Sequence, residues 1–385
     1  MSDKALQRRI KQHIIAKDFE FLCVCPPGFE EITKNELAQI GITGTNVIKG
    51  GVEFSTDFYK AFTACNKVRT AVRILVRIAK FKALYFHDLH DKIYNLNWEL
   101  YLKKNTVLSV SVKCHKSKLY HSDRVAQEVS KAVQKKLHNV ESIDDSSENS
   151  QTIFIRFDDD ICTVSLDIAG EPLYKRGWKP LINDAPIREN IAAGILIAAD
   201  LKTHENIIDP MCGSGTFLLE ALAITRDYNP LRNFAFQEFP CFINTRYKYN
   251  LKAAGIEQNI LKVFGSDIDS KSVKITADNL KIIGNSNEIS VKEQDFFNTA
   301  RADYPDGKSL IVMNPPYGKR FPIDSTKKLF ERILIKLNND FKNCSYVIIM
   351  PEYIFRGMKI VYDKNLFFKN GDIDVCAIIK LSEGL

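Results

Sequence analysis

A tetrapeptide that could handle an amino group lies late in the chain, at Asn314-Pro315-Pro316-Tyr317. It follows an apolar run at 310–313, so we expect it at the end of a buried strand. The two prolines lack amide donors, which leaves backbone carbonyls that can accept hydrogen bonds. The Asn314 side-chain oxygen and the Pro315 carbonyl could accept both hydrogens of a planar base amine and aim its lone pair at an electrophilic methyl group. Tyr317 could stack on the base. We therefore predict that these four residues are catalytic by alignment, without a metal or a strong general base; an ordinary strand-ending turn is the alternative.

A glycine turn at 209–216, with the sequence DPMCGSGT, is the second candidate site. An expected strand ends at Asp209, and a helix opens after Gly215, so a ligand could approach both the bare backbone and the free amides of the helix N-terminus. The turn is neither a P-loop nor the dinucleotide fingerprint. An acid before the glycines suits a ligand with a positive amino group, such as the methionine part of S-adenosylmethionine. A purely structural turn stays open.

Two further acids follow the next expected strands. Asp267, followed by Ile268, lies where the ribose hydroxyls of an adenosine would lie, and Asp295-Phe296 could hold and stack an adenine. Each acid alone is more often a helix cap. Three acids at successive strand ends favour a nucleoside ligand, because open α/β sheets bind ligands at this edge.

The composition indicates an ordinary globular protein of 385 residues, 45% of them apolar, in two or three domains. No apolar run approaches the roughly 20 residues that span a bilayer. The segment 1–17 is basic and lacks the apolar core of a secretory signal, so we expect an arm or a short helix. Nine scattered cysteines without a paired C-x-x-C spacing indicate reduced thiols in a cytoplasmic protein and predict no metal site.

The positive charge gathers in one region of the chain. The net charge is +7, but residues 61–140 hold 16 Lys and Arg against 5 Asp and Glu, whereas 181–385 hold 26 against 25. Such a local excess favours a surface that binds a polyanion, with solvated lysines as the alternative. The candidates for phosphate contacts are Lys113, Lys116, Lys118, Arg124, Lys131, Lys135 and Lys136, of which about half could be merely solubilising.

The elements that must position these residues fall into two kinds. The first half mixes strands and helices: strands at 21–25, 51–54, 71–79, 107–112, 153–157 and 163–168, and helices at 30–40, after 58, at 89–101 and at 122–137. The stretch 141–151 is predicted to be an exposed turn. From Pro186 on, helices alternate with short buried strands at 207–208, 263–267, 289–291, 310–313 and 346–349, the pattern of a doubly wound parallel sheet. A hairpin of 366–369 and 375–381 with its turn at Asn370-Gly371 closes the chain.

The two motifs, at 209–216 and 314–320, resemble those of the THUMP-domain RNA methyltransferases, most closely the bacterial large-subunit rRNA guanine-N2 methyltransferases of the RlmL type. The resemblance covers nearly the whole chain. The segment 27–30 is similar to the family's ferredoxin-like unit, and 97–137 is similar to its THUMP domain. The segment 173–178 is similar to its interdomain junction, and 185–190 to the helix that flanks the cofactor.

This resemblance implies an α/β fold: a Rossmann-like class I methyltransferase with a seven-stranded doubly wound sheet, preceded by an α+β ferredoxin-like unit and a THUMP domain. The implied boundaries are 19–65, 66–172 and 173–385. The implied cofactor is S-adenosylmethionine, and its contacts would be Arg188, Asp209, Pro210, Cys212, Gly213, Gly215, Thr216, Asp267, Ile268, Asp295, Phe296 and Asn314.

The identity of the substrate stays open at this point. Guanine N2 and adenine N6 both fit the tetrapeptide, and the basic first half favours RNA. The hypotheses are a guanine-N2 methyltransferase of 23S rRNA, favoured by the resemblance, one of tRNA, an adenine-N6 nucleic-acid methyltransferase, and a non-catalytic RNA-binding factor. The segment 232–248 departs from the family, and its Arg246, Tyr247 and Lys248 either face RNA or, as we favour, pack against the protein.

Overall fold

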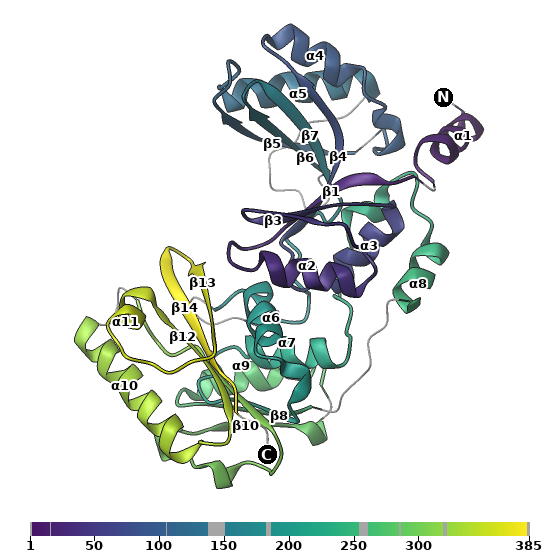
Figure 1. Cartoon of the computed structure of the whole chain (residues 1–385). Helices are drawn as coiled ribbons and strands as arrows, with labels where there is room; N and C mark the ends of the chain where they lie inside the picture. The colour runs from purple at the N-terminus through teal and green to yellow at the C-terminus, as the bar shows by residue number, and fades with distance from the viewer. Residues whose placement is uncertain are drawn as a thin grey trace. The chain divides into compact units, whose positions relative to one another are not determined.

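The chain folds into two compact units, each built on a seven-stranded sheet (Figure 1). Unit 1 comprises Met1–Cys25, Thr33–Leu173 and Arg232–Ala254, and unit 2 comprises Pro26–Ile32, Tyr174–Leu231 and Gly255–Leu385. The computed structural model describes residues 2–15, 17–104, 106–137, 151–181, 186–253, 261–284, 286–318 and 322–382. The exposed turn predicted at 141–151 lies outside these residues, apart from Gln151.

The sheet of unit 1 has the strand order β2-β3-β1-β4-β7-β6-β5, in which β5 and β6 are parallel and the other neighbours antiparallel. Its strands are β1 (Phe19–Val24), β2 (Asn46–Ile48), β3 (Gly51–Thr56), β4 (Arg73–Lys82), β5 (Leu108–His115), β6 (Gln151–Asp158) and β7 (Ile161–Asp167), and its helices are α1 (Asp3–His13), α2 (Glu30–Gln39, whose first turn belongs to unit 2), α3 (Phe58–Lys67), α4 (Phe86–Tyr94), α5 (Ser122–Leu137) and α8 (Asn244–Ala253).

Local sequence explains most of these elements. Helix α5 buries Val125, Val129 and Val133, four residues apart, and has the bounds that the periodicity predicts. The N-terminal segment forms the short helix rather than the arm: the Ser2 hydroxyl accepts from the Ala5 amide at 3.4 Å.

The helix predicted at 89–101 is wrong in its bounds. Helix α4 begins at Phe86 and ends at Tyr94, and Trp98–Leu100 forms a separate 3-10 turn. The break satisfies a buried donor, because the Trp98 indole nitrogen donates to the Ile93 carbonyl at 2.7 Å. The apolar spacing continued across the break and concealed it.

The segment 232–254 packs within unit 1, although its neighbours in sequence belong to unit 2. Phe236 is fully buried there, and Tyr247 is buried. The Arg246 guanidinium carbon lies 4.2 Å from the centre of the Tyr59 ring. The prediction that this segment packs against the protein is confirmed for Arg246 and Tyr247, whereas Lys248 is exposed.

The sheet of unit 2 has the order β10-β9-β8-β11-β12-β14-β13; the first five strands are parallel, and β14 is antiparallel to both its neighbours. This is the doubly wound sheet that the sequence pattern predicts, with the seven strands that the family resemblance implies. The strands are β8 (Asn206–Asp209), β9 (Lys262–Asp267), β10 (Ile289–Glu293), β11 (Ser309–Met313), β12 (Ser345–Pro351), β13 (Lys364–Asn370) and β14 (Ile373–Lys380), and the helices are α6 (Glu189–Ala198), α7 (Thr216–Thr225), α9 (Ser270–Leu280), α10 (Ile323–Asp340) and α11 (Glu352–Arg356).

Both faces of this sheet are buried. On β11, Leu310 and Val312 join the core formed with α6 and α7, whereas Ile311 and Met313 join the core formed with α10. Helices α6, α7 and α9 therefore cover one face and α10 the other (Figure 1). Burial on both faces explains why β11 reads as a continuous apolar run.

The turn of the C-terminal hairpin lies one residue later than predicted. Asn370 pairs with Ile373 in the ladder, so the two loop residues are Gly371 and Asp372. Gly371 has φ +61° and Asp372 does not have a positive φ. A type II′ turn requires a positive φ at the first loop residue only. An Asn-Gly pair is typical of a type I′ turn, in which both loop residues have a positive φ. Asn370 is therefore the last residue of β13.

No helix among the described residues is long and apolar enough to cross a membrane. No group of three or more His, Cys, Asp or Glu side chains there is placed to hold a metal ion. All nine cysteines carry free thiols, and eight of them are buried.

Candidate active site

The predicted site residues meet at the carboxyl edge of the unit 2 sheet. Four parallel strands end there side by side, so the turns that follow them face a common cavity of about 1100 Å³. The predicted residues that line this cavity are Arg188, Asp209, Pro210, Cys212, Gly213, Thr216, Asp267, Ile268, Asp295, Phe296, Asn314, Pro315, Pro316 and Tyr317. Lys319 and Arg320, at the end of the motif, lie outside the described residues, as does Ala185.

The two glycines of the turn after β8 have different surroundings. Gly213 lines the cavity with φ +54°, and a Cβ on it would meet no atom within 4 Å. Gly215 does not line the cavity. It has φ +79°, and a Cβ there would lie 2.9 Å from the Thr276 side chain, so α7 can begin here only at a glycine. Gly213 thus leaves room for a ligand, whereas Gly215 allows close packing.

Asp209 is a buried carboxyl at the wall of the cavity. It is 2% exposed, and its Oδ1 accepts the Met211 amide at 3.2 Å. Burial raises the pKa of Asp209 to about 8, and the neighbouring Asp267 adds to this effect. A cation bound in the cavity beside Asp209 would favour the ionised carboxylate and lower this pKa again.

The other two acids also accept backbone hydrogen bonds. Asp267 accepts from the amides of Gly213 and Asp269, each at 3.0 Å, and Asp295 accepts from Phe297 at 2.9 Å. Asp267 and Asp295 therefore both cap backbone amides, which was the alternative left open by the sequence, and both also line the cavity.

An apolar side chain and a basic one complete this part of the cavity. Ile268 is 73% exposed at the wall, an apolar surface that a planar ring could cover. Arg188 precedes α6, with its guanidinium carbon 5.4 Å from the centre of the Tyr174 ring.

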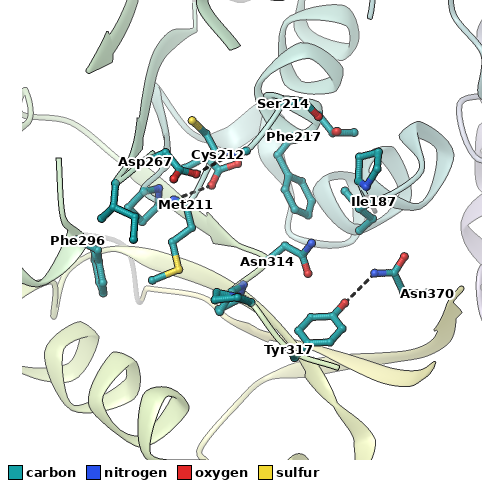
Figure 2. A pocket seen from close by; sticks show the side chains of 18 of the residues that line it. Ile187, Met211, Cys212, Ser214, Phe217, Asp267, Phe296, Asn314, Tyr317 and Asn370 are labelled. Carbon is teal, nitrogen blue, oxygen red and sulfur yellow. Dashed lines mark hydrogen bonds between the residues drawn. The ribbon is translucent and has the colours of Figure 1, made fainter. Parts of the chain in front are cut away.

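The tetrapeptide after β11 presents an acceptor that lacks a partner. The Asn314 Oδ1 is buried and receives no hydrogen bond within the described residues. Pro315 is buried beside it, and Pro316 is exposed. Tyr317 lies at the same side of the cavity, and burial raises the pKa of its hydroxyl to about 12, so this group stays neutral (Figure 2). An unsatisfied acceptor at a cavity wall is suited to receive an N–H group of a ligand.

Further lining residues were not predicted. Met211, Ser214 and Phe217 belong to the glycine-turn motif or to the helix turn after it, so the motif could have indicated them. The hairpin residues Asn370, Gly371 and Ile373, by contrast, carry no signal in the sequence. The rest of the unpredicted lining consists of Pro186, Ile187, Phe297, Gly318 and Leu329.

The predicted phosphate-binding cations lie in unit 1, on β5 (Lys113), in the segment between β5 and α5 (Lys116 and Lys118) and on α5 (Arg124, Lys131, Lys135 and Lys136). All are exposed except the half-buried Lys136. Helices α4 and α5 run parallel, since Arg124 lies 4.1 Å from the Phe86 ring at one end and Lys135 lies 5.5 Å from the Tyr94 ring at the other. About 17 Å of helix separates these two ends.

The first of these ends carries exposed aromatic rings. The Lys118 ammonium lies 4.2 Å from the centre of the Tyr85 ring, and Tyr85 and Tyr120 are 49% and 66% exposed. We call the residues Tyr85, Lys116, Lys118, Tyr120 and Arg124 the loop-end cluster. It combines cations with rings on which bases can stack.

Comparisons with known proteins cover most of the chain. Three family descriptions match: "RlmL ferredoxin-like domain" at residues 20–75, "THUMP domain" at 83–167 and "RMKL-like, methyltransferase domain" at 176–355. The "Ribosomal RNA large subunit methyltransferase K/L" of Buchnera aphidicola is 28% identical over 364 residues, which are 90% of this chain and 52% of that protein. The chain thus spans about half the length of the curated relatives that it matches.

Two solved structures resemble the chain over their whole length. A putative methyltransferase, SMU.472, complexed with SAH, has a TM-score of 0.83 and 25% identity, covering 96% of this chain and 100% of that one. A possible methylase from Clostridium difficile 630 has a TM-score of 0.81 and 28% identity, covering 96% and 99%.

Proposed function

Because the chain belongs to the THUMP-domain methyltransferases, which use S-adenosylmethionine, we propose that it methylates N2 of a guanine in 23S ribosomal RNA. The observation that carries this proposal is the buried Asn314 oxygen without a partner, at the wall of the cavity that the three acids also line. An acceptor in this position matches an exocyclic amine. The names of the curated relatives support ribosomal RNA as the substrate.

The cavity fits the methyl donor by the chemistry of its walls. When bound, S-adenosylmethionine supplies an electrophilic methyl group on a cationic sulfur. Asp209 would hold its ammonium group, Asp267 the ribose hydroxyls and Asp295 the adenine amine, with Ile268 and Phe296 against the ring. The remaining contacts that we propose are Arg188, Pro210, Cys212, Gly213, Thr216 and Asn314.

The tetrapeptide would orient the nucleophile. The Asn314 Oδ1 and the Pro315 carbonyl accept the two hydrogens of the guanine amine, and Tyr317 stacks on the base. These hydrogen bonds draw the nitrogen lone pair out of conjugation and aim it along the line of attack. The amine nitrogen would bond to the methyl carbon while the bond from that carbon to the sulfur breaks, and the nitrogen would then lose a proton to water. Alignment supplies most of the rate enhancement.

The RNA would be held by the first half of the chain. We propose that Lys113, Lys116, Lys118, Arg124, Lys131 and Lys135 contribute phosphate contacts, and that the functional domains are 19–65, 66–172 and 173–385, in a cytoplasmic protein. A target inside a helix would have to be flipped out of its stack to reach the cavity, which favours a base in a loop or bulge.

The test is nucleoside mass spectrometry of 23S rRNA and tRNA from cells with and without this gene. We expect N2-methylguanosine to fall in 23S rRNA of the deletion strain and to return when the purified protein and S-adenosylmethionine are added to that RNA. A loss confined to tRNA, a loss of N6-methyladenosine, or no loss at all would refute the assignment.

A further inference from the structure

The tip of the C-terminal hairpin forms part of the cavity wall next to the tetrapeptide. Asn370 ends β13 and Ile373 begins β14. These two residues form the pair nearest the tip, and both line the cavity. The Asn370 side-chain nitrogen donates to the Tyr317 hydroxyl at 2.8 Å, as Figure 2 shows. The hydrogen bond joins two elements that are 53 residues apart in the chain.

The hairpin is braced, so Asn370 has a fixed position. Strand β13 pairs with β14 along its whole length. Near the tip, the Phe368 ring packs edge-on against Phe29 with ring centres 5.7 Å apart. On the side of the tetrapeptide, a Cβ on Gly318 would lie only 3.1 Å from the Ile373 side chain, so the turn after Tyr317 contacts the hairpin closely.

The hydrogen bond determines where the Tyr317 ring lies. A tyrosine ring rotates about two side-chain bonds, and a bond at its far end restricts both. The Tyr317 side chain is half-buried, and burial raises the pKa of its hydroxyl, so this group stays neutral and would cost free energy without a hydrogen-bond partner. The Tyr317 ring, which we expect to stack on the target base, is therefore held at both ends. The backbone after β11 holds it at one end, and Asn370 of the hairpin holds its hydroxyl at the other.

We propose that Asn370 is a positioning residue for the target base: through the Tyr317 hydroxyl it holds the aromatic ring at the angle at which the base stacks. This inference rests on the proposed function of Tyr317. A misplaced ring would still allow RNA to bind through phosphate contacts, but the amine would meet Asn314 in a productive geometry less often. The loss should therefore fall on kcat more than on KM.

The test compares variants of the 385-residue chain, with 23S rRNA from the deletion strain as the probe. Asn370→Leu, which cannot donate, should lower kcat about fivefold, the worth of one hydrogen bond. Asn370→Asp should restore most of the rate, because the tyrosine hydroxyl can donate to a carboxylate. Lys369→Ala is the matched control: Lys369 is the neighbouring residue, its ion pair with Asp374 is exposed, and its loss should change nothing.

A double-mutant cycle separates positioning from general support of the fold. If Asn370 acts through the hydroxyl, Asn370→Leu in a Tyr317→Phe background should be no slower than Tyr317→Phe alone. The affinity of Asn370→Leu for SAH should stay at the wild-type value, and its unfolding temperature should fall by no more than the loss of one hydrogen bond explains. An Asn370→Leu enzyme with the wild-type rate, no rescue by Asp, or equal losses in both backgrounds would each overturn the proposal. If the wild type methylated another nucleotide instead, the proposed substrate would fail, but the same variants tested on that RNA would still decide the role of Asn370.

Discussion

At the scale of single residues, the most informative atom is the Asn314 oxygen, because its placement opposes the stability of the fold. A buried acceptor without a partner costs about 1–3 kcal/mol. Such a cost is tolerated where the atom serves a ligand. Activity and stability should therefore respond in opposite directions when this side chain is removed.

Asn314→Ala tests this opposition. We expect methyl transfer to be lost, because the amine is no longer held, while the unfolding temperature stays the same or rises, since an unsatisfied group has gone. The measurements are methylation of 23S rRNA from the deletion strain and thermal unfolding of the ligand-free protein. A variant that turned over near the wild-type rate would show that Asn314 does not hold the amine.

Asp209 gives a second case, in which the sign of a pH effect can be worked out. Its pKa in the folded protein is about 8, whereas an unfolded chain leaves a carboxyl near 4. Between these values the folded state keeps a proton that the unfolded state releases. This group therefore lowers stability as pH rises through the window from about 4 to 8. Binding of an ammonium group needs the carboxylate, so affinity for the cofactor should rise across the upper part of the same window.

Asp209→Asn should separate the two effects. The variant keeps an acceptor for the Met211 amide, so at pH 8 its ligand-free form should unfold at a higher temperature than the wild type. Its affinity for SAH should fall about tenfold or more, the worth of a charged hydrogen bond, and lose the pH dependence that Asp209 contributes. Isothermal calorimetry and thermal unfolding at pH 6 and pH 8.5 measure both. An unchanged affinity for SAH would remove Asp209 from the binding site.

At the scale of elements, the sequence predicts best where one physical pattern determines the structure. Strand β11 is apolar from Leu310 to Met313 because both of its faces are buried, and the acids at the strand ends meet because parallel strands share an edge. Two predicted elements, the helix at 89–101 and the hairpin turn, had wrong bounds because a second interaction determined where they end. The Trp98 indole bond breaks the expected helix, and the type II′ turn moves Asn370 into the strand. The contact between Asn370 and Tyr317 leaves no local pattern in the sequence at all.

The hairpin also offers a test of how the tip is braced. Gly28 has φ +94°, and a Cβ there would lie 2.4 Å from the Phe367 carbonyl oxygen of β13. Gly371, at the tip, also has a positive φ, but nothing lies within 4 Å of its missing Cβ. Gly371→Ala should cost about 1–2 kcal/mol from backbone strain alone. Gly28→Ala should cost roughly 2 kcal/mol more, because β13 must move.

Denaturant unfolding of the two variants, followed with a probe in unit 2, measures this difference. Both substitutions introduce the same methyl group in the same unit, so a larger loss for Gly28→Ala reports the contact with β13. Equal losses would mean that the segment before α2 does not brace the hairpin.

At the scale of the whole molecule, packing does not follow the order of the chain. The segment Pro26–Ile32 packs within unit 2, with Phe29 fully buried, whereas 232–254 packs within unit 1. Hydrophobic periodicity predicted the helix at 30–40 but could not say which core its first turn or the segment 232–254 joins, because that depends on contacts distant in sequence. The domain boundaries at 65 and 172 stay a prediction.

If unit 1 binds the RNA, the salt dependence of RNA affinity should show which of its lysines contact phosphates. Electrostatic binding to RNA weakens with salt in proportion to the number of phosphates neutralised, by about 0.7 log units per tenfold salt for each phosphate on a single strand. In the loop-end cluster, Lys116 and Lys118 accompany exposed rings, whereas Lys131, near the other end of α5, is paired with Glu128 at 3.1 Å. We therefore expect the first pair to carry more of the RNA contact than Lys131 and Lys135.

Lys116→Gln/Lys118→Gln should weaken binding of 23S rRNA from the deletion strain and flatten the plot of log affinity against log salt by about 1.4, the value for two phosphate contacts. Lys131→Gln/Lys135→Gln is the control with the same change of charge, and it should alter the slope much less. Filter binding between 50 and 200 mM salt measures both slopes. If the control pair flattened the slope and the loop-end pair did not, the RNA would follow the far end of α5, because the two pairs differ in position rather than in charge.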